Sequence, residues 1–135
     1  MKATKSILAS LMLIGLFSLS AMAQQDAKVI AVVNRADWCP ICKANGKRAH
    51  EVFMENNKDH SIKFLTNDLT NAETIGKSDE VLKKYGLDKI MKNYNGTGVI
   101  FFFNPKTKAL IEQISAAQSN KELMAAMQTA KKSVN

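Results

Sequence analysis

The chain has 135 residues, of which 19 are Lys or Arg and 12 are Asp or Glu, so its formal net charge is +7. This length is that of one small domain. The lysines are scattered along the sequence and do not alternate with aromatic residues as a base-stacking surface requires, so the composition argues against a nucleic-acid-binding protein.

The first 23 residues have the pattern of a secretory signal peptide. Two early lysines precede a mostly apolar run at Ile7–Leu19, and the letters "AMA" then supply the small residues of a cleavage site. The apolar run is shorter than the roughly 20 residues that span a bilayer, which argues against a permanent anchor. We therefore expect residues 1–23 to be removed. Residues 24–135 are expected to act as one exported domain, periplasmic or extracellular, monomeric and without a membrane anchor.

The mature chain alternates between apolar, β-branched runs and stretches of helical periodicity. A strand, a helix and a second strand should form a parallel unit, and two later strands joined by "NPKTK" should form a hairpin. The order β-α-β-α-β-β-α predicts an α/β fold, with a small mixed four-stranded sheet flanked by helices. The expected strands lie at 28–34, 61–67, 99–103 and 109–114, and the expected helices at 40–56, 78–85, 88–94 and 119–134.

Cys39 and Cys42 are the only cysteines of the chain. A bridge that closes so short a loop removes little entropy from the unfolded chain, so it would be a poor structural staple. Cys39 precedes Pro40 at a helix start, where free amide groups and the helix dipole stabilise a thiolate. Cys42, one turn later, can attack a mixed disulfide formed at Cys39. We therefore predict a redox-active pair, with Cys39 as the nucleophile, Cys42 as the resolving thiol and no further cofactor.

The residues "WCPIC", which follow an apolar strand and open a helix, resemble the active site of the thioredoxin superfamily. The resemblance implies the thioredoxin-like fold and thiol-disulfide oxidoreductase activity on protein thiols or disulfides, with a separate electron donor. It also implies that Trp38, Pro40 and Ile41 form part of the surface that receives the substrate. Because no histidine lies between the cysteines, we expect a reducing or isomerising protein rather than a strongly oxidising one.

The sequence departs from this family in its short N-terminal segment at 24–27, which lacks the extra strand and helix of full thioredoxins, and at two positions near the motif. Val33 stands where relatives often have a buried aspartate that accepts a proton from the resolving cysteine. Gly98, preceded by Thr97, stands where the family has a cis-proline that faces the cysteines. The resemblance implies that Thr97 and Gly98 contact the substrate. A glycine there should leave a free backbone N–H and open space beside the sulfurs. Because Cys39 sits at the helix start and Cys42 lies inside the first turn, we expect Cys39 to be the more exposed of the two.

Two other functions are compatible with the same residues. Both cysteines could bind copper(I), with His50, His60 or Met91 as a third ligand, in a metal-delivery module of the same fold. No resident metal site is predicted, since no second pair of spaced ligands completes one. The other alternative is a domain that docks a partner around Trp38 and whose redox activity is slow.

Overall fold

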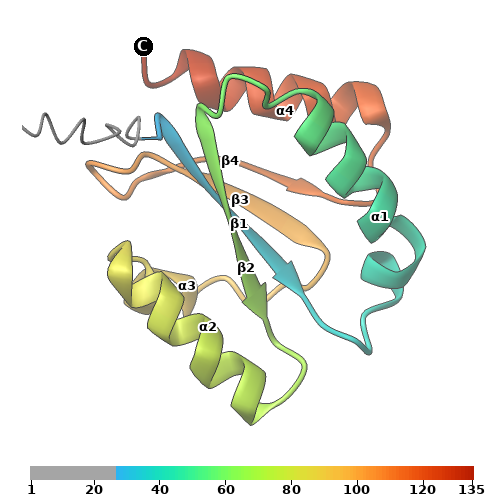
Figure 1. Ribbon diagram of the computed structural model, residues 1–135. Helices are drawn as coiled ribbons and strands as arrows, with labels where there is room; N and C mark the ends of the chain where they lie inside the picture. The colour runs from blue at the N-terminus through green and yellow to red at the C-terminus, as the bar shows by residue number, and fades with distance from the viewer. Residues whose placement is uncertain (1–26) are drawn as a thin grey trace, which may run out of the picture.

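The computed structural model describes residues 27–135, so the predicted signal peptide at 1–23 lies outside the described residues. The described part of the chain forms four strands and four helices in the predicted order (Figure 1). In chain order these elements are β1 (Val29–Arg35), α1 (Pro40–Glu55), β2 (Ile62–Asp68), α2 (Ala72–Lys84), α3 (Asp88–Met91), β3 (Val99–Phe103), β4 (Leu110–Ser115) and α4 (Asn120–Lys132).

The strands form one mixed sheet in the order β2-β1-β3-β4. β1 is parallel to β2, whereas β3 is antiparallel to both β1 and β4. Residues 29–32 of β1 and 100–103 of β3 are buried. These two strands are paired on both edges and covered on both faces, which is why their sequences are apolar without alternation. The predicted small mixed sheet is confirmed.

Helices cover both faces of the sheet, with α1 and α4 on one side and α2 and α3 on the other (Figure 1). Successive residues of β1 therefore belong to different cores. Ala31 lies in one cluster with Phe53 of α1 and Met127 of α4, whereas Val32 lies in the other with Leu82 of α2. This layering places the start of α1 just beyond the carboxyl end of β1, where the two cysteines lie.

Helix α2 begins earlier than the sequence analysis predicted. Its N-cap is Asn71, whose side chain accepts the N–H of Thr74 at 3.0 Å in a capping box, and not Ser78. Ser78 is instead buried within the helix, where its hydroxyl accepts the N–H of Asp68 at 2.9 Å. The predicted start was wrong because this capping box uses threonine at the position where glutamate or glutamine is usual.

The other helix ends follow the signals in the sequence. Pro40 opens α1, and Ser119 caps α4 through a capping box with Glu122. Gly86, with φ of 70°, ends α2 in the left-handed conformation that glycine adopts readily. None of the helices in residues 27–135 is long and apolar enough to cross a membrane.

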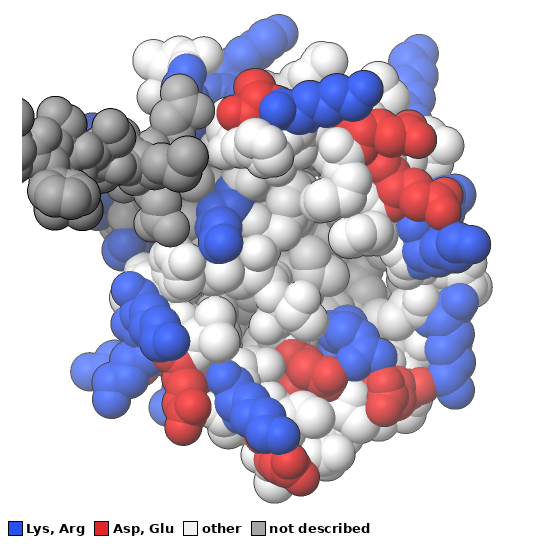
Figure 2. All heavy atoms as spheres, viewed as in Figure 1, with Lys and Arg blue, Asp and Glu red and all other residues white. Residues whose placement is uncertain are grey.

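The surface carries both signs of charge. Figure 2 shows Lys and Arg side chains around the rim of this face with Asp and Glu among them, and mainly uncharged residues in the centre. Exposed ion pairs such as Lys77–Glu73, at 2.6 Å, contribute little to stability. On this face the basic residues therefore form no continuous tract.

Candidate active site

The first cysteine of the motif lies at the start of α1 because the chain turns sharply after β1. Its N–H donates to the carbonyl of Ala36 at 3.1 Å, and Pro40 then enters as the first helical residue. As the N-cap, Cys39 turns its sulfur over the first turn, where Sγ accepts the N–H of Cys42 at 3.1 Å. The amide and the helix dipole would both stabilise negative charge on this sulfur.

Cys39 and Cys42 are joined in a disulfide, with their Cα atoms 5.3 Å apart, so the structure shows the oxidised state of the pair. Among residues 27–135, no group of three or more His, Cys, Asp or Glu side chains is placed to hold a metal ion. The third ligands considered for copper(I) are also dispersed. His60 is exposed just before β2, Met91 is buried against α2, and only His50 lies on the same side of α1 as Cys42.

The two cysteines differ in exposure, in the sense opposite to the one expected from the sequence. Cys39 is only 1% exposed, whereas Cys42 is partly exposed. Cys39 is covered because Gly98 and Ile41 close over it. A Cβ atom placed on Gly98 would lie 3.5 Å from the Cys39 sulfur and 2.7 Å from Cγ2 of Ile41. The structure therefore brings Cys39, Ile41 and Gly98 together, and the expectation that Cys39 is the more exposed cysteine is wrong for the disulfide form.

The backbone of Gly98 is fully used within the protein. Its N–H donates to the carbonyl of Asn34 at 2.8 Å, and its own carbonyl accepts the N–H of Ala116 at 2.8 Å. Its φ is 74°, a conformation that a proline ring excludes. The expected free N–H and the expected open space are both wrong, since Asn34 takes the first and Ile41 fills the second. Thr97, which precedes Gly98, is partly buried.

A buried amide side chain holds the loop that ends at Gly98. Asn34 is fully buried at the end of β1, and its Nδ2 donates to the carbonyls of Tyr94 at 2.7 Å and Gly96 at 3.1 Å. Its Oδ1 accepts a hydrogen bond from Asn67 of β2 at 2.9 Å. The sequence analysis missed this residue, although a polar side chain at the end of an apolar strand was its signal.

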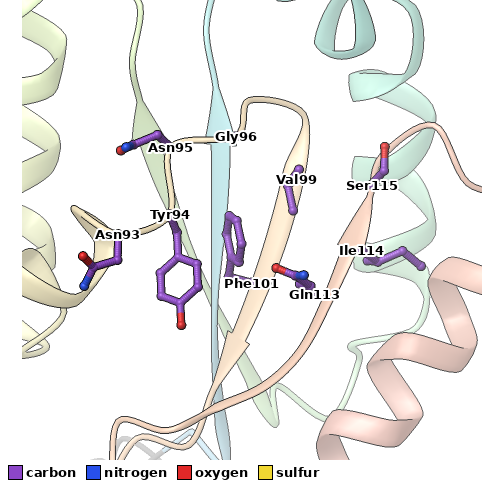
Figure 3. Close-up of a pocket in the computed structure, with 9 residues that line it drawn as sticks. All are labelled: Asn93, Tyr94, Asn95, Gly96, Val99, Phe101, Gln113, Ile114 and Ser115. Atoms are coloured by element: carbon purple, nitrogen blue, oxygen red, sulfur yellow. The ribbon is translucent and has the colours of Figure 1, made fainter.

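The same loop is anchored from its other end by aromatic packing. Figure 3 shows Tyr94 beside Phe101 of β3, and their ring centroids lie 5.0 Å apart. The hollow in this view has a volume of about 440 Å³ and is lined by the loop together with β3 and β4. Neither cysteine lines it. The hollow is therefore separate from the disulfide and borders only the loop that leads to Gly98.

The exposed tryptophan is held in place by the loop that follows β2. Trp38 is 58% exposed, yet its indole N–H donates to the carbonyl of Thr70 at 3.2 Å. The Thr70 hydroxyl in turn accepts the N–H of Asp37 at 3.0 Å and donates to Asp68 at 2.5 Å. Arg35 contacts Asp37 and Asp68, each at 2.5 Å. This network ties the turn before the cysteines to the carboxyl end of β2, and the sequence analysis missed Thr70 and Asp68.

In this network one guanidinium, that of Arg35, is shared by two carboxylates. Hydrogen bonds from Thr70, with further help from the charge of Arg35, hold the pKa of Asp68 below its usual value. The hydrogen bond to Asp37 raises the pKa of Arg35. Because Asp37 is paired with Arg35, its negative charge opposes a thiolate at Cys39 less than an unpaired carboxylate would.

A larger cavity lies on the inner side of α1. Its volume is about 590 Å³, and it extends between α1 and the sheet. Cys42 forms part of its wall, Cys39 does not, and Val33 lies opposite at the position where the family has its acid. The wall at the position of the expected acid is thus apolar, and the cavity's carboxylate, Asp37, is exposed and paired with Arg35.

The comparisons with known proteins support the fold. No protein-family model and no curated protein sequence matches the chain. Among solved structures, thioredoxin of Malassezia sympodialis is 16% identical, with 76% of this chain and 78% of that chain covered and a TM-score of 0.50. StoA of Bacillus subtilis is 17% identical, with 75% and 83% covered and a TM-score of 0.50. At these identities the likeness is one of fold, and the thioredoxin-like fold implied by the motif is confirmed.

Proposed function

We propose that this thioredoxin-fold protein is an exported thiol-disulfide oxidoreductase that acts through Cys39 and Cys42. The observation that supports this most directly is the disulfide between them, at the N-terminus of α1 and next to an exposed Trp38. A disulfide that closes so short a loop contributes little to stability. It can instead accept two electrons by thiol-disulfide exchange, next to a surface that a partner can reach.

In the reduced protein, Cys39 would act as the nucleophile. The N–H of Cys42 and the dipole of α1 stabilise its thiolate. The thiolate attacks a substrate disulfide, forms a mixed disulfide and releases the first substrate thiolate, which takes up a proton. The Cys42 thiolate then attacks Cys39 Sγ and releases the second substrate sulfur. The substrate is reduced by two electrons, and the protein returns to the disulfide state seen in the structure.

The substrate would bind over the start of α1. Trp38, Pro40 and Ile41 are exposed there, and they form an apolar surface next to Thr97 and the buried sulfur. Because Ile41 and Gly98 cover Cys39 in the oxidised protein, a substrate has to displace the Ile41 side chain to reach this sulfur. Ile41 is 37% exposed and lies in the first helical turn, so it has room to change rotamer.

The sequence supports our proposal for the direction and the place of the reaction. No histidine separates the cysteines, which favours a reducing or isomerising protein over a strong oxidant. The signal-peptide pattern at 1–23 would export the chain to the periplasm or the outside of the cell, as a monomer made of residues 24–135. In such an oxidising compartment, a reductant requires a continuous supply of electrons from a donor.

The test is insulin reduction by the chemically reduced domain, residues 24–135, followed by precipitation of the insulin B chain. We expect turnover with dithiothreitol as donor, and none with Cys39→Ser. A titration against glutathione buffers would give the potential, and we expect it to lie nearer to reducing than to strongly oxidising members of the fold. A wild-type domain that leaves insulin intact contradicts the proposal.

The second candidate function is partner docking with slow redox chemistry. It is favoured by the geometry of Trp38, which is exposed and yet fixed by its hydrogen bond to Thr70. A fixed, exposed aromatic side chain loses little entropy when a partner covers it. This candidate predicts stoichiometric partner capture without insulin turnover, so the same assay separates the two functions.

A further inference from the structure

The cavity beside Cys42 exists because α1 carries very small residues next to that cysteine. Cys42, Gly46, Ala49 and Phe53 follow one another at spacings of four, three and four, which places them on one face of the helix. All four line the cavity. A Cβ on Gly46 would meet no atom within 4 Å, so the space in front of it is empty.

The glycine that leaves this space open lowers the stability of α1. A glycine inside a helix is less stable than alanine by roughly 0.5–1 kcal/mol, and Gly46 lies in the middle of α1. The opposite wall is built by apolar side chains of the sheet, among them Val33, Phe64 and Ile100. The volume, about 590 Å³, lies within the range of small-molecule sites, which are mostly apolar with a few polar groups.

The charged side chains that line the cavity are two basic ones, Arg35 and Lys43, and one acidic one, Asp37. Lys43 and His50 come from α1 and are both exposed. Arg35 and Asp37 also line the cavity, but they pair with each other at 2.5 Å. The positive charge of Lys43 therefore remains available to a ligand, and it favours one that carries a carboxylate.

We propose that this cavity binds a low-molecular-weight thiol with a carboxylate group, and that this thiol reduces the disulfide by attacking Cys42. The proposal rests on the proposed function, for which it names the electron donor. Cys42 is the partly exposed residue of the pair and lines the cavity, whereas Cys39 is 1% exposed and covered by Gly98. The donor and the protein substrate thus use different sulfurs of one disulfide.

Reduction of the Cys39–Cys42 disulfide in this way consumes two molecules of the small thiol. The thiolate of the first forms a bond to Cys42 Sγ, the Cys39–Cys42 bond breaks, and Cys39 leaves as a thiolate. A second thiol attacks the sulfur of the first and releases Cys42, so that two thiols become one small disulfide and both cysteines take up a proton. Cys39 is the better leaving group, because the N–H of Cys42 and the dipole of α1 stabilise its negative charge.

Gly46→Leu tests the role of the cavity, because the new side chain would fill it from α1. The matched control is Gly76→Leu in α2, where a Cβ also meets nothing within 4 Å and which lies away from the cavity. The measurement is the rate of reduction of the oxidised domain by 3-mercaptopropionate, followed through the fluorescence of Trp38. We expect Gly46→Leu to slow this rate about tenfold. This is the loss expected when roughly two methylene groups of 3-mercaptopropionate can no longer be buried in the cavity. Gly76→Leu should react like the wild type.

A second measurement on the wild type needs no folded variant. The oxidised domain is mixed briefly with 3-mercaptopropionate, quenched with acid and alkylated, and each cysteine is located by mass spectrometry. We expect the thiol on Cys42 and the alkyl group on Cys39. At equal thiolate concentration, 3-mercaptopropionate should also react faster than cysteamine, which carries a positive charge.

Three results would overturn the proposal: the thiol bound mainly to Cys39, equal rates for Gly46→Leu and Gly76→Leu, or faster reduction by cysteamine. Its failure is distinguishable from failure of the proposed function. Insulin reduction by the chemically reduced wild type tests the function alone, since that reaction begins from free Cys39 and needs no small thiol in the cavity.

Discussion

Replacing Gly98 by alanine should destabilise the oxidised domain by about 2–3 kcal/mol. The left-handed φ of 74° costs a residue with a Cβ about 1–2 kcal/mol. The new methyl group would also lie 2.7 Å from Cγ2 and 2.9 Å from Cβ of Ile41. Moving Cγ2 requires another rotamer of Ile41 and moving Cβ requires a small backbone shift, and the rotamer change alone costs about 1 kcal/mol. For a domain of this size, such a loss lowers Tm by about 10 °C or more.

The assay is urea unfolding of oxidised residues 24–135, followed through the fluorescence of Trp38. Gly96→Ala is the matched control, because its Cβ would meet Val99 at an ordinary 3.5 Å. Adding Ile41→Ala to Gly98→Ala should restore part of the loss, since it removes the nearest clashing atom. If Gly98→Ala and Gly96→Ala unfold within about 0.5 kcal/mol of each other, Gly98 does not close over the disulfide as described.

Three further predictions concern the surroundings of the disulfide. Asn34→Ala should lower the free energy of unfolding by about 2–3 kcal/mol in urea titrations, because two part-buried carbonyls lose their donor and the buried amide of Asn67 loses its acceptor; a loss below 1 kcal/mol would contradict its role in holding the loop. Asp68 has a lowered pKa in the folded state, so its contribution is present above pH 4 and is lost as the pH falls through the folded pKa. Asp68→Asn should therefore flatten the loss of stability below pH 4, and an acid unfolding curve as steep as that of the wild type would refute this. Cys42→Ser should trap a stable mixed disulfide with a protein substrate on non-reducing gels and Cys39→Ser far less, whereas equal trapping would argue against an ordered exchange.

The order of strands and helices was predictable because each element carries a local signal. The run "VIFFF" has no polar alternation, and Val99–Phe103 is indeed a central strand. Pro40 after Cys39 marks a helix start, since only the first turn tolerates a residue without an N–H. The start of α2 was missed because Thr74 stands where a capping box usually has glutamate or glutamine, so the hydrogen bonds that make Asn71 the N-cap are not apparent from the sequence.

The pairing of Cys39 with Cys42 was also predictable, because it depends on their spacing along one helix. The exposure of their sulfurs was not, since that depends on residues far apart in the sequence. The antiparallel pairing of β1 with β3 sets Asn34 opposite Val99, and this register places Gly98 over Cys39. The cavity likewise needs Gly46 on α1 to face Val33 on the sheet. A sulfur's reactivity at a helix start is a local property of the chain, whereas its accessibility is decided by the neighbours that folding packs around it.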